Sequence, residues 1–165
     1  MIQIIDNFIS DKISKYCIDF FEQNIHLRKI YRCTSTINIG KTDEQGNYTG
    51  MPEFDDIFKF INNHTYKINK SVIEWIQIVK WPDDCNQPLH NDFASDRTVY
   101  SSIFYLNDGY FGGQTFFEEG TIIMPKKGRA LFFNGVEYKH GVMPIKKGPR
   151  YTLAAWYMKD KNGSH

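Results

Sequence analysis

The stretch H-G-V-M-P-I-K-K-G-P-R-Y-T-L-A-A-W-Y, residues 140–157, combines a lone histidine, an arginine ten positions later and an apolar, strand-like run. From residue 72 onward the chain repeats this alternation of strand-like runs and turn signals. The turn signals lie at residues 82–84, 107–109, 112–113, 125–128 and 148–149. The sequence therefore predicts an all-β core of short antiparallel strands, either a barrel or a two-sheet jelly roll.

The pentapeptide P-L-H-N-D, residues 88–92, supplies a second histidine and an aspartate two positions after it. Residues i and i+2 of an extended segment point to the same side, so His90 and Asp92 can share one metal ion. Two imidazoles and one carboxylate can occupy one face of an octahedral ferrous ion and leave the other positions open for reactants. We therefore predict that His90, Asp92 and His140 are the catalytic iron ligands. An H-x-D pair alone is common by chance, so this prediction depends on the motifs around it.

Several blocks resemble, in the same order, the prolyl 4-hydroxylase group of Fe(II)/2-oxoglutarate oxygenases. They are W-I-Q-I-V-K-W-P (75–82), P-L-H-N-D (88–92), I-F-Y-L-N-D-G-Y-F-G-G-Q-T-F-F (103–117), M-P-K-K-G-R-A-L-F-F (124–133) and the stretch 140–157. The third block is similar to the family's Y-L-N followed by G-G-x-T-x-F, and the fourth to its P-x-x-G-x-A-L-x-F. The resemblance covers residues 74–158 and implies a double-stranded β-helix, a cupin-like jelly roll with flanking helices.

The same resemblance implies a site for 2-oxoglutarate beside the iron. Arg150 matches a cation of the family, often a lysine, that binds the far carboxylate of this cosubstrate, and a guanidinium can do so with two parallel hydrogen bonds. Thr152 lies two residues on, faces the same side of a strand and can add a hydroxyl donor. Tyr105 matches a tyrosine that reaches the carboxylate in some members, although a core tyrosine with another partner is an alternative.

Three further residues are candidates for contact with the substrate. Trp156, six residues past Arg150, is predicted to line the mouth where substrate meets iron, although tryptophans in β cores commonly serve packing alone. Trp81 stands where many members of the family have a tyrosine, so a phenolic hydrogen bond is absent from that wall. Arg97 stands near a substrate-contacting arginine of some peptide-hydroxylating members, but the local spacing does not align cleanly.

These residues and the resemblance predict a dioxygenase that hydroxylates a prolyl residue in a peptide or protein. It would use Fe(II), O2 and 2-oxoglutarate, release succinate and carbon dioxide, and have ascorbate as a candidate reductant. The same chemistry on a free amino acid or other small molecule is an alternative that the size of the pocket would distinguish. A noncatalytic ligand-binding jelly roll is another alternative, disfavoured because all the candidate ligands and Arg150 are present.

Composition limits the class of partner. The chain has 165 residues, with 20 basic and 19 acidic side chains and a net charge of +1. This balance gives no basic stripe for a polyanion and disfavours nucleic-acid demethylation. The length predicts one domain over residues 1–165. The sequence has no long apolar run and no basic leader, so we expect neither a membrane span nor a secretory signal.

The cysteines are Cys17, Cys33 and Cys85, which are odd in number and widely spaced. This pattern predicts buried or incidental thiols rather than a disulfide framework or a zinc site. Together with the absence of a leader, it favours a reducing, cytoplasmic location. The terminal G-S-H, residues 163–165, is interpreted either as native sequence or as a cloning remnant.

The first 70 residues match the family only loosely and are predicted to form a helical support for a β-helix core at residues 71–159. Within them, residues 1–5 predict a short strand, and Ser10 is expected to cap a helix that ends near Asn24.

A second helix is expected to begin at Pro52, with acidic residues near its positive end. Between the helices, residues 32–51 are polar and contain several glycines, which predicts an exposed loop or loose hairpin. This segment would be either a lid over the substrate or an ordinary surface connection.

Overall fold

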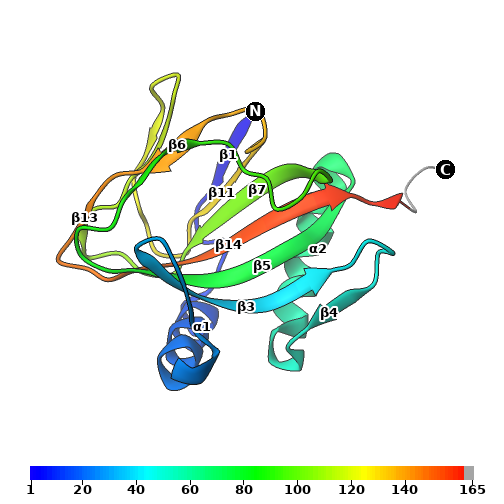
Figure 1. Ribbon diagram of the computed structural model, residues 1–165, viewed down its shortest axis with the longest axis horizontal. Helices are drawn as coiled ribbons and strands as arrows, with labels where there is room; N and C mark the ends of the chain where they lie inside the picture. Colours follow the sequence, from blue (N-terminus) through cyan, green and yellow to red (C-terminus); the bar gives the residue numbers. More distant parts are fainter. Residues whose placement is uncertain (162–165) are drawn as a thin grey trace.

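A large antiparallel sheet forms the centre of the molecule in the computed structural model, which describes residues 1–161 (Figure 1). The terminal G-S-H, residues 163–165, lies outside these residues. Eight strands form this sheet, in the order β1-β11-β7-β14-β5-β3-β2, with β4 paired to β3. The strands are β1 (Ile2–Ile5), β2 (Lys29–Tyr31), β3 (Thr34–Thr42), β4 (Tyr48–Gly50), β5 (Ser71–Trp81), β7 (Thr98–Tyr105), β11 (Ala130–Phe133) and β14 (Arg150–Lys159).

A smaller sheet of four strands, in the order β10-β9-β12-β6, packs over one end of the large sheet. Its strands are β6 (Gln87–His90), β9 (Thr115–Phe117), β10 (Ile122–Ile123) and β12 (His140–Val142). A two-stranded ribbon of β8 (Phe111–Gly112) and β13 (Ile145–Lys146) lies beside it. The predicted core of short antiparallel strands in two sheets is confirmed.

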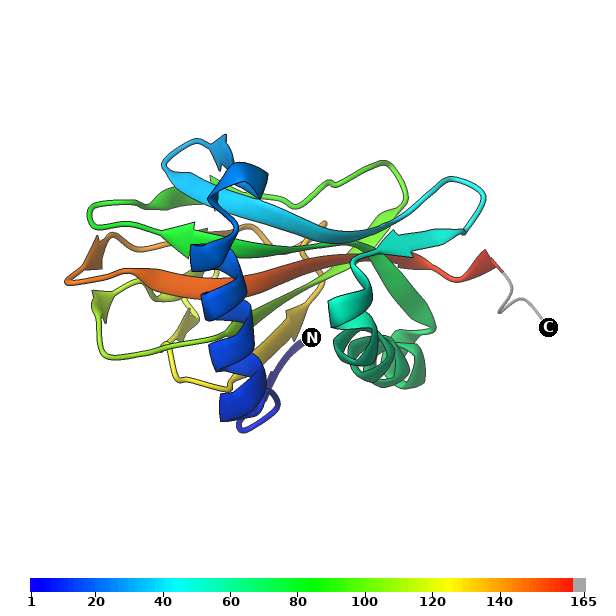
Figure 2. The same cartoon turned by 90° about the horizontal axis from the view of Figure 1, so that it is seen from below.

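Two helices pack against the large sheet, as Figure 2 shows from below. Helix α1 (Asp11–Gln23) begins after Ser10, whose side chain accepts a hydrogen bond from the Ile13 N–H, and ends at Asn24 as predicted. Helix α2 (Asp55–Asn69) follows a 3-10 turn, η2 (Pro52–Phe54), so Pro52 begins that turn rather than the α-helix. A second 3-10 turn, η1 (Ile25–Leu27), follows α1. Within residues 1–161, no helix has the length and apolar character needed to cross a membrane.

Alternation along the central strands separates a helix-facing core from a cleft on the opposite face. The residues of β14 that pack in the core are Tyr151, Leu153, Ala155 and Tyr157. The residues of β14 that line the cleft are Arg150, Thr152, Ala154 and Trp156. On β5, the cleft is lined by Trp75, Gln77, Val79 and Trp81, while Ile76 and Ile78 belong to the core. Since side chains alternate between the faces of a strand, the same strands build the core and the cleft.

The prediction of an exposed loop or loose hairpin over residues 32–51 was wrong for its first half, which lies inside the large sheet. Thr34–Thr42 form β3, which pairs with β5 inside the large sheet, and only Tyr48–Gly50 folds back on it as a hairpin. The segment is polar in composition, yet it can lie within the sheet because buried threonines find hydrogen-bond partners there. The Thr42 hydroxyl, for example, donates to the Ile73 carbonyl at 2.6 Å. The first 70 residues therefore supply strands of the main sheet as well as helices, and β3 is not a movable lid.

The expectation of free thiols was also wrong, because Cys33 and Cys85 form a disulfide. The two cysteines are 52 positions apart in sequence, but the pairing of β3 with β5 brings Ser35 opposite Lys80 and so brings the adjoining turns together. Cys17 is free and buried. Disulfides persist mainly in oxidising compartments. The cysteines therefore no longer support a reducing cytoplasm, and the location of the protein stays a prediction.

Glu22 links α1 to the large sheet. Its carboxylate lies 2.7 Å from Lys80 Nζ on β5 and 3.0 Å from Arg28 Nη2, and it accepts a hydrogen bond from the Tyr151 hydroxyl on β14. Burial alone would raise the pKa of Glu22, but the hydrogen bonds from Lys80 and Tyr151 and the charges of Lys80 and Arg28 lower it to about 2.

Glu22→Gln is expected to lower the free energy of unfolding at neutral pH by about 1 kcal/mol, a modest value because the carboxylate is partly exposed. The folded pKa lies below the ordinary value of 4.5, so this contribution is present above that value and is lost as the pH falls towards about 2. Denaturant unfolding of both proteins across this range measures the difference. A difference that did not shrink in acid, or an equal loss in the exposed control Glu53→Gln, would contradict the assignment.

Candidate active site

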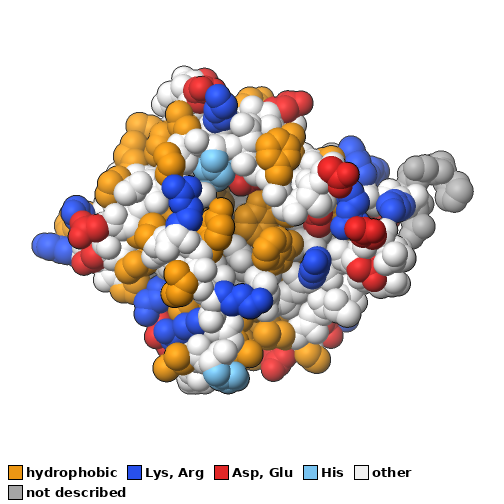
Figure 3. Space-filling view, viewed as in Figure 1, with side chains coloured by type: hydrophobic (Ala, Val, Ile, Leu, Met, Phe, Trp, Pro, Cys, Tyr) orange, Lys and Arg blue, Asp and Glu red, His pale blue; other side chains and the backbone are white. Residues whose placement is uncertain are grey.

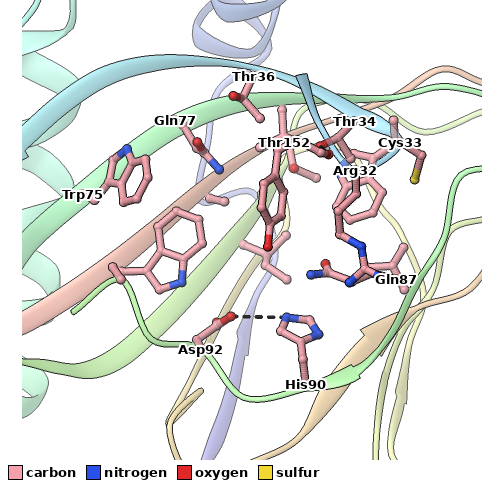
Figure 4. Close-up of a pocket in the computed structure, with 18 of the residues that line it drawn as sticks. Arg32, Cys33, Thr34, Thr36, Trp75, Gln77, Gln87, His90, Asp92 and Thr152 are labelled. Atoms are coloured by element: carbon pink, nitrogen blue, oxygen red, sulfur yellow. Dashed lines mark hydrogen bonds and ion pairs between the residues drawn. The ribbon is translucent and has the colours of Figure 1, made fainter. Parts of the chain in front are cut away.

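Three metal-ligating side chains converge at one end of the cleft. His90 ends β6, His140 begins β12, and Asp92 follows His90 by two residues. Strand β12 pairs with β6 so that His140 lies opposite His90. The ligand atoms of the three side chains all lie within 4.8 Å of one another. Figure 4 shows Asp92 and His90 directed towards each other at the edge of the cleft.

The Asp92 carboxylate lies between the two imidazoles. Its Oδ1 is 3.3 Å from His90 Nε2, and its Oδ2 is 3.3 Å from His140 Nε2. The other ring nitrogen, Nδ1, lies 2.9 Å from the Pro88 carbonyl in His90 and 3.0 Å from the Tyr138 carbonyl in His140. A carbonyl only accepts, so in each neutral imidazole Nδ1 carries the proton and Nε2 offers its lone pair to the shared centre.

Electrostatics keep Asp92 ionised. When the two imidazoles are protonated, Nε2 donates instead of offering a lone pair. Burial alone would raise the pKa of the Asp92 carboxyl, but the hydrogen bonds from the protonated rings of His140 and His90 hold it well below its ordinary value. Burial would lower the pKa of His90, and the hydrogen bonds to Asp92 and Pro88 outweigh that effect and raise it. Two imidazole nitrogens and an ionised carboxylate on one side of an open cleft are a donor set that fits a ferrous ion.

Gly135, in the turn after β11, leaves the space that Asp92 needs. Its carbonyl accepts the Asp92 N–H at 2.8 Å. A Cβ at this position would lie 2.3 Å from Ser101 Oγ and 2.8 Å from Asp92 Oδ2. Sequence patterns do not indicate this role, because N-G is an ordinary turn dipeptide after a strand.

Gly135→Ala is expected to weaken Mn(II) binding by about 10- to 100-fold, because the added methyl displaces the carboxylate and its support. Isothermal titration with Mn(II) measures the loss, and circular dichroism checks the fold. Gly46→Ala is the matched control, since Gly46 has a φ of +86° but no atom within 4 Å of an added Cβ. Its strain of about 1–2 kcal/mol should leave metal affinity unchanged. Equal metal affinity in the Gly135 variant and the parent would refute the positioning role.

Arg150 is a buried charge in the same cleft. It begins β14 opposite Trp81 and is only 1% exposed. Its guanidinium carbon lies 4.8 Å from the Trp81 ring centroid and 5.3 Å from that of Tyr105. Among residues 1–161, no hydrogen-bond acceptor meets its Nε or Nη2, and no carboxylate pairs with it. A buried cation without a counterion is costly, so this position indicates an anion site.

Two more buried donors without an acceptor in the described chain belong to Trp81 (Nε1) and Tyr110 (hydroxyl). Burial raises the pKa of Tyr110 to about 12, and the adjacent Arg150 charge opposes this shift, so the hydroxyl keeps its proton. Gly113, with a φ of +67°, allows the side chains of Tyr110 and Arg150 to approach the backbone closely. A Cβ at this position would lie 2.9 Å from Tyr110 and 3.1 Å from Arg150. These donors together fit the acceptor oxygens of a carboxylate.

The other residues predicted for the cosubstrate site lie around Arg150. Thr152 is buried and lines the cleft on the same face (Figure 4). Tyr105 is buried beside the guanidinium, but its hydroxyl is hydrogen-bonded to Thr115 Oγ1 at 2.6 Å. This is the other partner that the sequence had left open for Tyr105. Tyr110 and Thr115 were not predicted individually, although both lie in the block 103–117.

The residues predicted to contact substrate are divided between two hollows. Trp156 lines the cleft, with its ring 5.6 Å from that of Trp75. Arg97 instead donates to the Asp43 carbonyl at 3.0 Å and lies 3.7 Å from the buried carboxylate of Glu74, in a neighbouring hollow. The structure therefore does not bring Arg97 together with the other predicted residues.

Glu74 in this second hollow supports the segment that follows Asp92. Its carboxylate accepts hydrogen bonds from the Thr98 hydroxyl, at 2.7 Å, and from the Ser95 hydroxyl. The Thr98 hydroxyl in turn accepts the backbone N–H groups of Ala94 and Ser95. The loop that carries Asp92 is therefore fixed to β5.

The cleft has a volume of about 550 Å³ and joins the His-Asp-His cluster to Arg150. Figure 3 shows a hollow on this face, bordered by hydrophobic side chains next to a histidine. The apolar residues on its rim include Ile30, which is 79% exposed, Tyr31 and Phe93, which is 65% exposed. The volume is in the ordinary range of ligand pockets, and the apolar rim extends the surface beyond it.

A jelly roll that carries two histidines and a carboxylate at the mouth of such a cleft has the architecture of a non-haem iron oxygenase. Comparison with known families agrees, because the model of the 2OG-Fe(II) oxygenase superfamily matches residues 76–158. The chain belongs to this superfamily.

Several proteins that this chain resembles are prolyl hydroxylases. Human prolyl 3-hydroxylase 3 is 40% identical over 65 residues, and chicken (Gallus gallus) prolyl 3-hydroxylase 1 is 38% identical over 72 residues. These matches cover 35% and 39% of this chain but only 9% and 10% of the relatives, so the chain corresponds to a small part of their length.

Two solved structures share the fold over nearly the whole chain. The prolyl-4-hydroxylase of Pseudomonas putida has a TM-score of 0.77 at 17% identity, covering 96% of this chain and 92% of that one. The viral collagen prolyl hydroxylase of Paramecium Bursaria Chlorella virus-1 has a TM-score of 0.72 at 21% identity, covering 97% and 96%. The likeness confirms the predicted double-stranded β-helix.

Proposed function

We propose that this chain is an Fe(II)- and 2-oxoglutarate-dependent dioxygenase that hydroxylates a prolyl residue in a peptide or protein. One observation carries the proposal: the His90-Asp92-His140 cluster and the unpaired, buried Arg150 open into the same cleft. The prolyl part is supported by the relatives, which are prolyl 3-hydroxylases in sequence and prolyl hydroxylases in structure. The structure of a relative from Trichoplax adhaerens contains a hypoxia inducible factor peptide fragment.

In this proposal His90, Asp92 and His140 bind Fe(II) through Nε2 and carboxylate oxygens. Bound iron and 2-oxoglutarate supply the oxidation, in which O2 is consumed and 2-oxoglutarate becomes succinate and carbon dioxide. The backbone carbonyls of Pro88 and Tyr138 keep each imidazole in the tautomer that a metal requires. The protein thus supplies ligand geometry before any reactant arrives.

Arg150 binds the far carboxylate of 2-oxoglutarate, with Thr152 as an additional donor. The indole of Trp81 covers the guanidinium and keeps water from it, which strengthens the ion pair in the buried site. The Tyr110 hydroxyl is a further donor to the same anion. It would take the place of the tyrosine hydroxyl that many family members have at the position of Trp81. Tyr105 acts indirectly, since its ring packs on Arg150 while its hydroxyl binds Thr115.

The shape of the cleft favours a peptide over a small molecule. Its mouth lies between the β2–β3 turn and the loop after β6, and exposed apolar side chains continue outward from it. A free amino acid would leave this apolar rim in water, whereas an extended peptide would cover it. The rings of Trp75 and Trp156 offer flat apolar faces to a prolyl ring inside the cleft.

Arg150→Gln is expected to weaken 2-oxoglutarate binding by about 30-fold or more, because it removes the charged partner of a desolvated ion pair. Arg150→Lys should retain part of the affinity, since an ammonium keeps the charge but not the two parallel hydrogen bonds. Calorimetric titration of 2-oxoglutarate into protein saturated with Mn(II) measures both. The Mn(II) affinity of each variant without 2-oxoglutarate is the internal control. Unchanged 2-oxoglutarate affinity in Arg150→Gln would exclude the assigned role.

The function itself is tested by incubating the protein with Fe(II), ascorbate, 2-oxoglutarate and a library of proline-containing peptides in air. Mass spectrometry should detect the gain of one oxygen atom on proline, and comparison with 3- and 4-hydroxyproline standards identifies the carbon. Asp92→Ala should abolish the product, and the matched control Asp96→Ala, on an exposed loop residue, should retain it. Succinate release with no modified peptide would reject the prolyl substrate in favour of a small molecule.

A further inference from the structure

Arg32 occupies the turn between β2 and β3 at the mouth of the cleft. Its backbone has a positive φ of 55°, and its side chain lines the cleft. In Figure 4 the side chain extends from the turn towards Gln87 and His90. Arg32 and the candidate metal ligands His90, Asp92 and His140 line the same cleft.

Arg32 differs in its pairing from three of the other four arginines of the chain. Arg28, Arg97 and Arg129 each lie within ion-pair distance of a carboxylate. Arg32 and Arg150 have no such partner among residues 1–161, and both line the same cleft. Arg150 is buried, and in the proposed function its charge is paired by the far carboxylate of 2-oxoglutarate. No carboxylate within residues 1–161 pairs with Arg32.

The lining of the cleft is positively charged. Its ionised side chains are Lys29, Arg32 and Arg150 against a single carboxylate, Asp92, which lies between the two histidines. The chain as a whole has a net charge of only +1. The cationic character is therefore local to the cleft, where it favours the approach of an anionic group.

The backbone beneath Arg32 is held in place. The next residue, Cys33, is cross-linked to Cys85 after β5, and the Thr34 hydroxyl donates to the Tyr31 carbonyl at 2.7 Å across the turn. Both contacts restrict the turn that carries Arg32 without engaging its guanidinium. A cation on a restrained turn loses less entropy on binding an anion than one on a free loop.

We propose that Arg32 determines substrate specificity by binding a carboxylate of the substrate that lies next to the reacting proline. This inference rests on the proposed function. The carboxylate belongs either to an aspartate or glutamate side chain within a peptide or to a free C-terminus. The neighbouring apolar rim of Ile30, Tyr31 and Phe93 suits the peptide residues that continue past the acidic one.

The test uses short peptides with one proline, blocked at both ends, that carry either Asp or Asn at each of the two positions on either side. A second set has a free or an amidated C-terminus directly after the proline. Binding to protein loaded with Mn(II) and 2-oxoglutarate is followed by tryptophan fluorescence, and turnover with Fe(II) gives KM and kcat separately. We expect an Asp peptide to bind about tenfold more tightly than the matching Asn peptide at one position, or the peptide with a free C-terminus to bind about tenfold more tightly than the amidated one. The position identifies the source of the carboxylate.

Arg32→Gln should remove this preference and leave binding of the neutral peptide within about twofold, with the change in KM rather than kcat. Arg32→Glu should reverse the preference towards a Lys-containing peptide. Lys59→Gln, an exposed residue of α2, is the control for net charge. Equal binding of Asp and Asn peptides by the parent, or an equal loss of preference in Lys29→Gln, would overturn the assignment to Arg32.

The outcomes separate this inference from the proposed function. Hydroxylation of proline with no preference for acidic peptides would remove the role of Arg32 and leave the enzyme assignment intact. An Arg32-dependent preference in binding without hydroxylation of any peptide would support the carboxylate site and remove the prolyl hydroxylase proposal.

Discussion

The pairing of β14 with β5 on one side and β7 on the other is the constraint on which the rest of the structure depends. Because side chains alternate along a strand, this pairing sends Tyr151 and Leu153 into the helix-packed core and Arg150 and Thr152 into the cleft. The burial of the core residues thus fixes the register of the residues in the cleft. A slip by one position would expose the apolar set and bury the polar one, so stability and site geometry are enforced together.

The cleft contains two buried charges, the Asp92 carboxylate and the Arg150 guanidinium, and each lies where a ligand of opposite charge could bind. At one end an ionised carboxylate lies between two imidazoles that offer lone pairs to a cation. At the other end the Arg150 guanidinium is covered by aromatic rings and lacks an anion. Burying either charge alone is unfavourable, so in the proposed function the fold carries a cost that binding of a metal ion and of 2-oxoglutarate would relieve. This coupling implies that the loaded protein is more stable than the empty one.

The candidate metal cluster and the fold could be predicted because the H-x-D pair stands among several family-like blocks in order, and because the turn signals divide the second half of the chain into strands. The local geometry expected for the pair was only partly right, since β6 ends at His90 and Asp92 lies in the loop that follows. Strand β3 could not be predicted, because its inward threonines look polar in sequence and are satisfied only by contacts made in the sheet. The Cys33–Cys85 bond and the role of Gly135 depend on segments far apart in the chain, which spacing cannot show.

The hydrogen-bonded pair of Glu74 and Thr98 lies outside the cleft, yet it fixes the loop that holds Asp92, a candidate metal ligand. Loss of one partner leaves a buried carboxylate or a backbone N–H unsatisfied, whereas an exchange of both for apolar groups of similar shape is far less costly. We therefore expect substitutions at positions 74 and 98 to depend on each other during evolution. Among homologues, replacement of the acid at 74 should be accompanied by replacement of the hydroxyl at 98, as a correlated change remote from the chemistry itself.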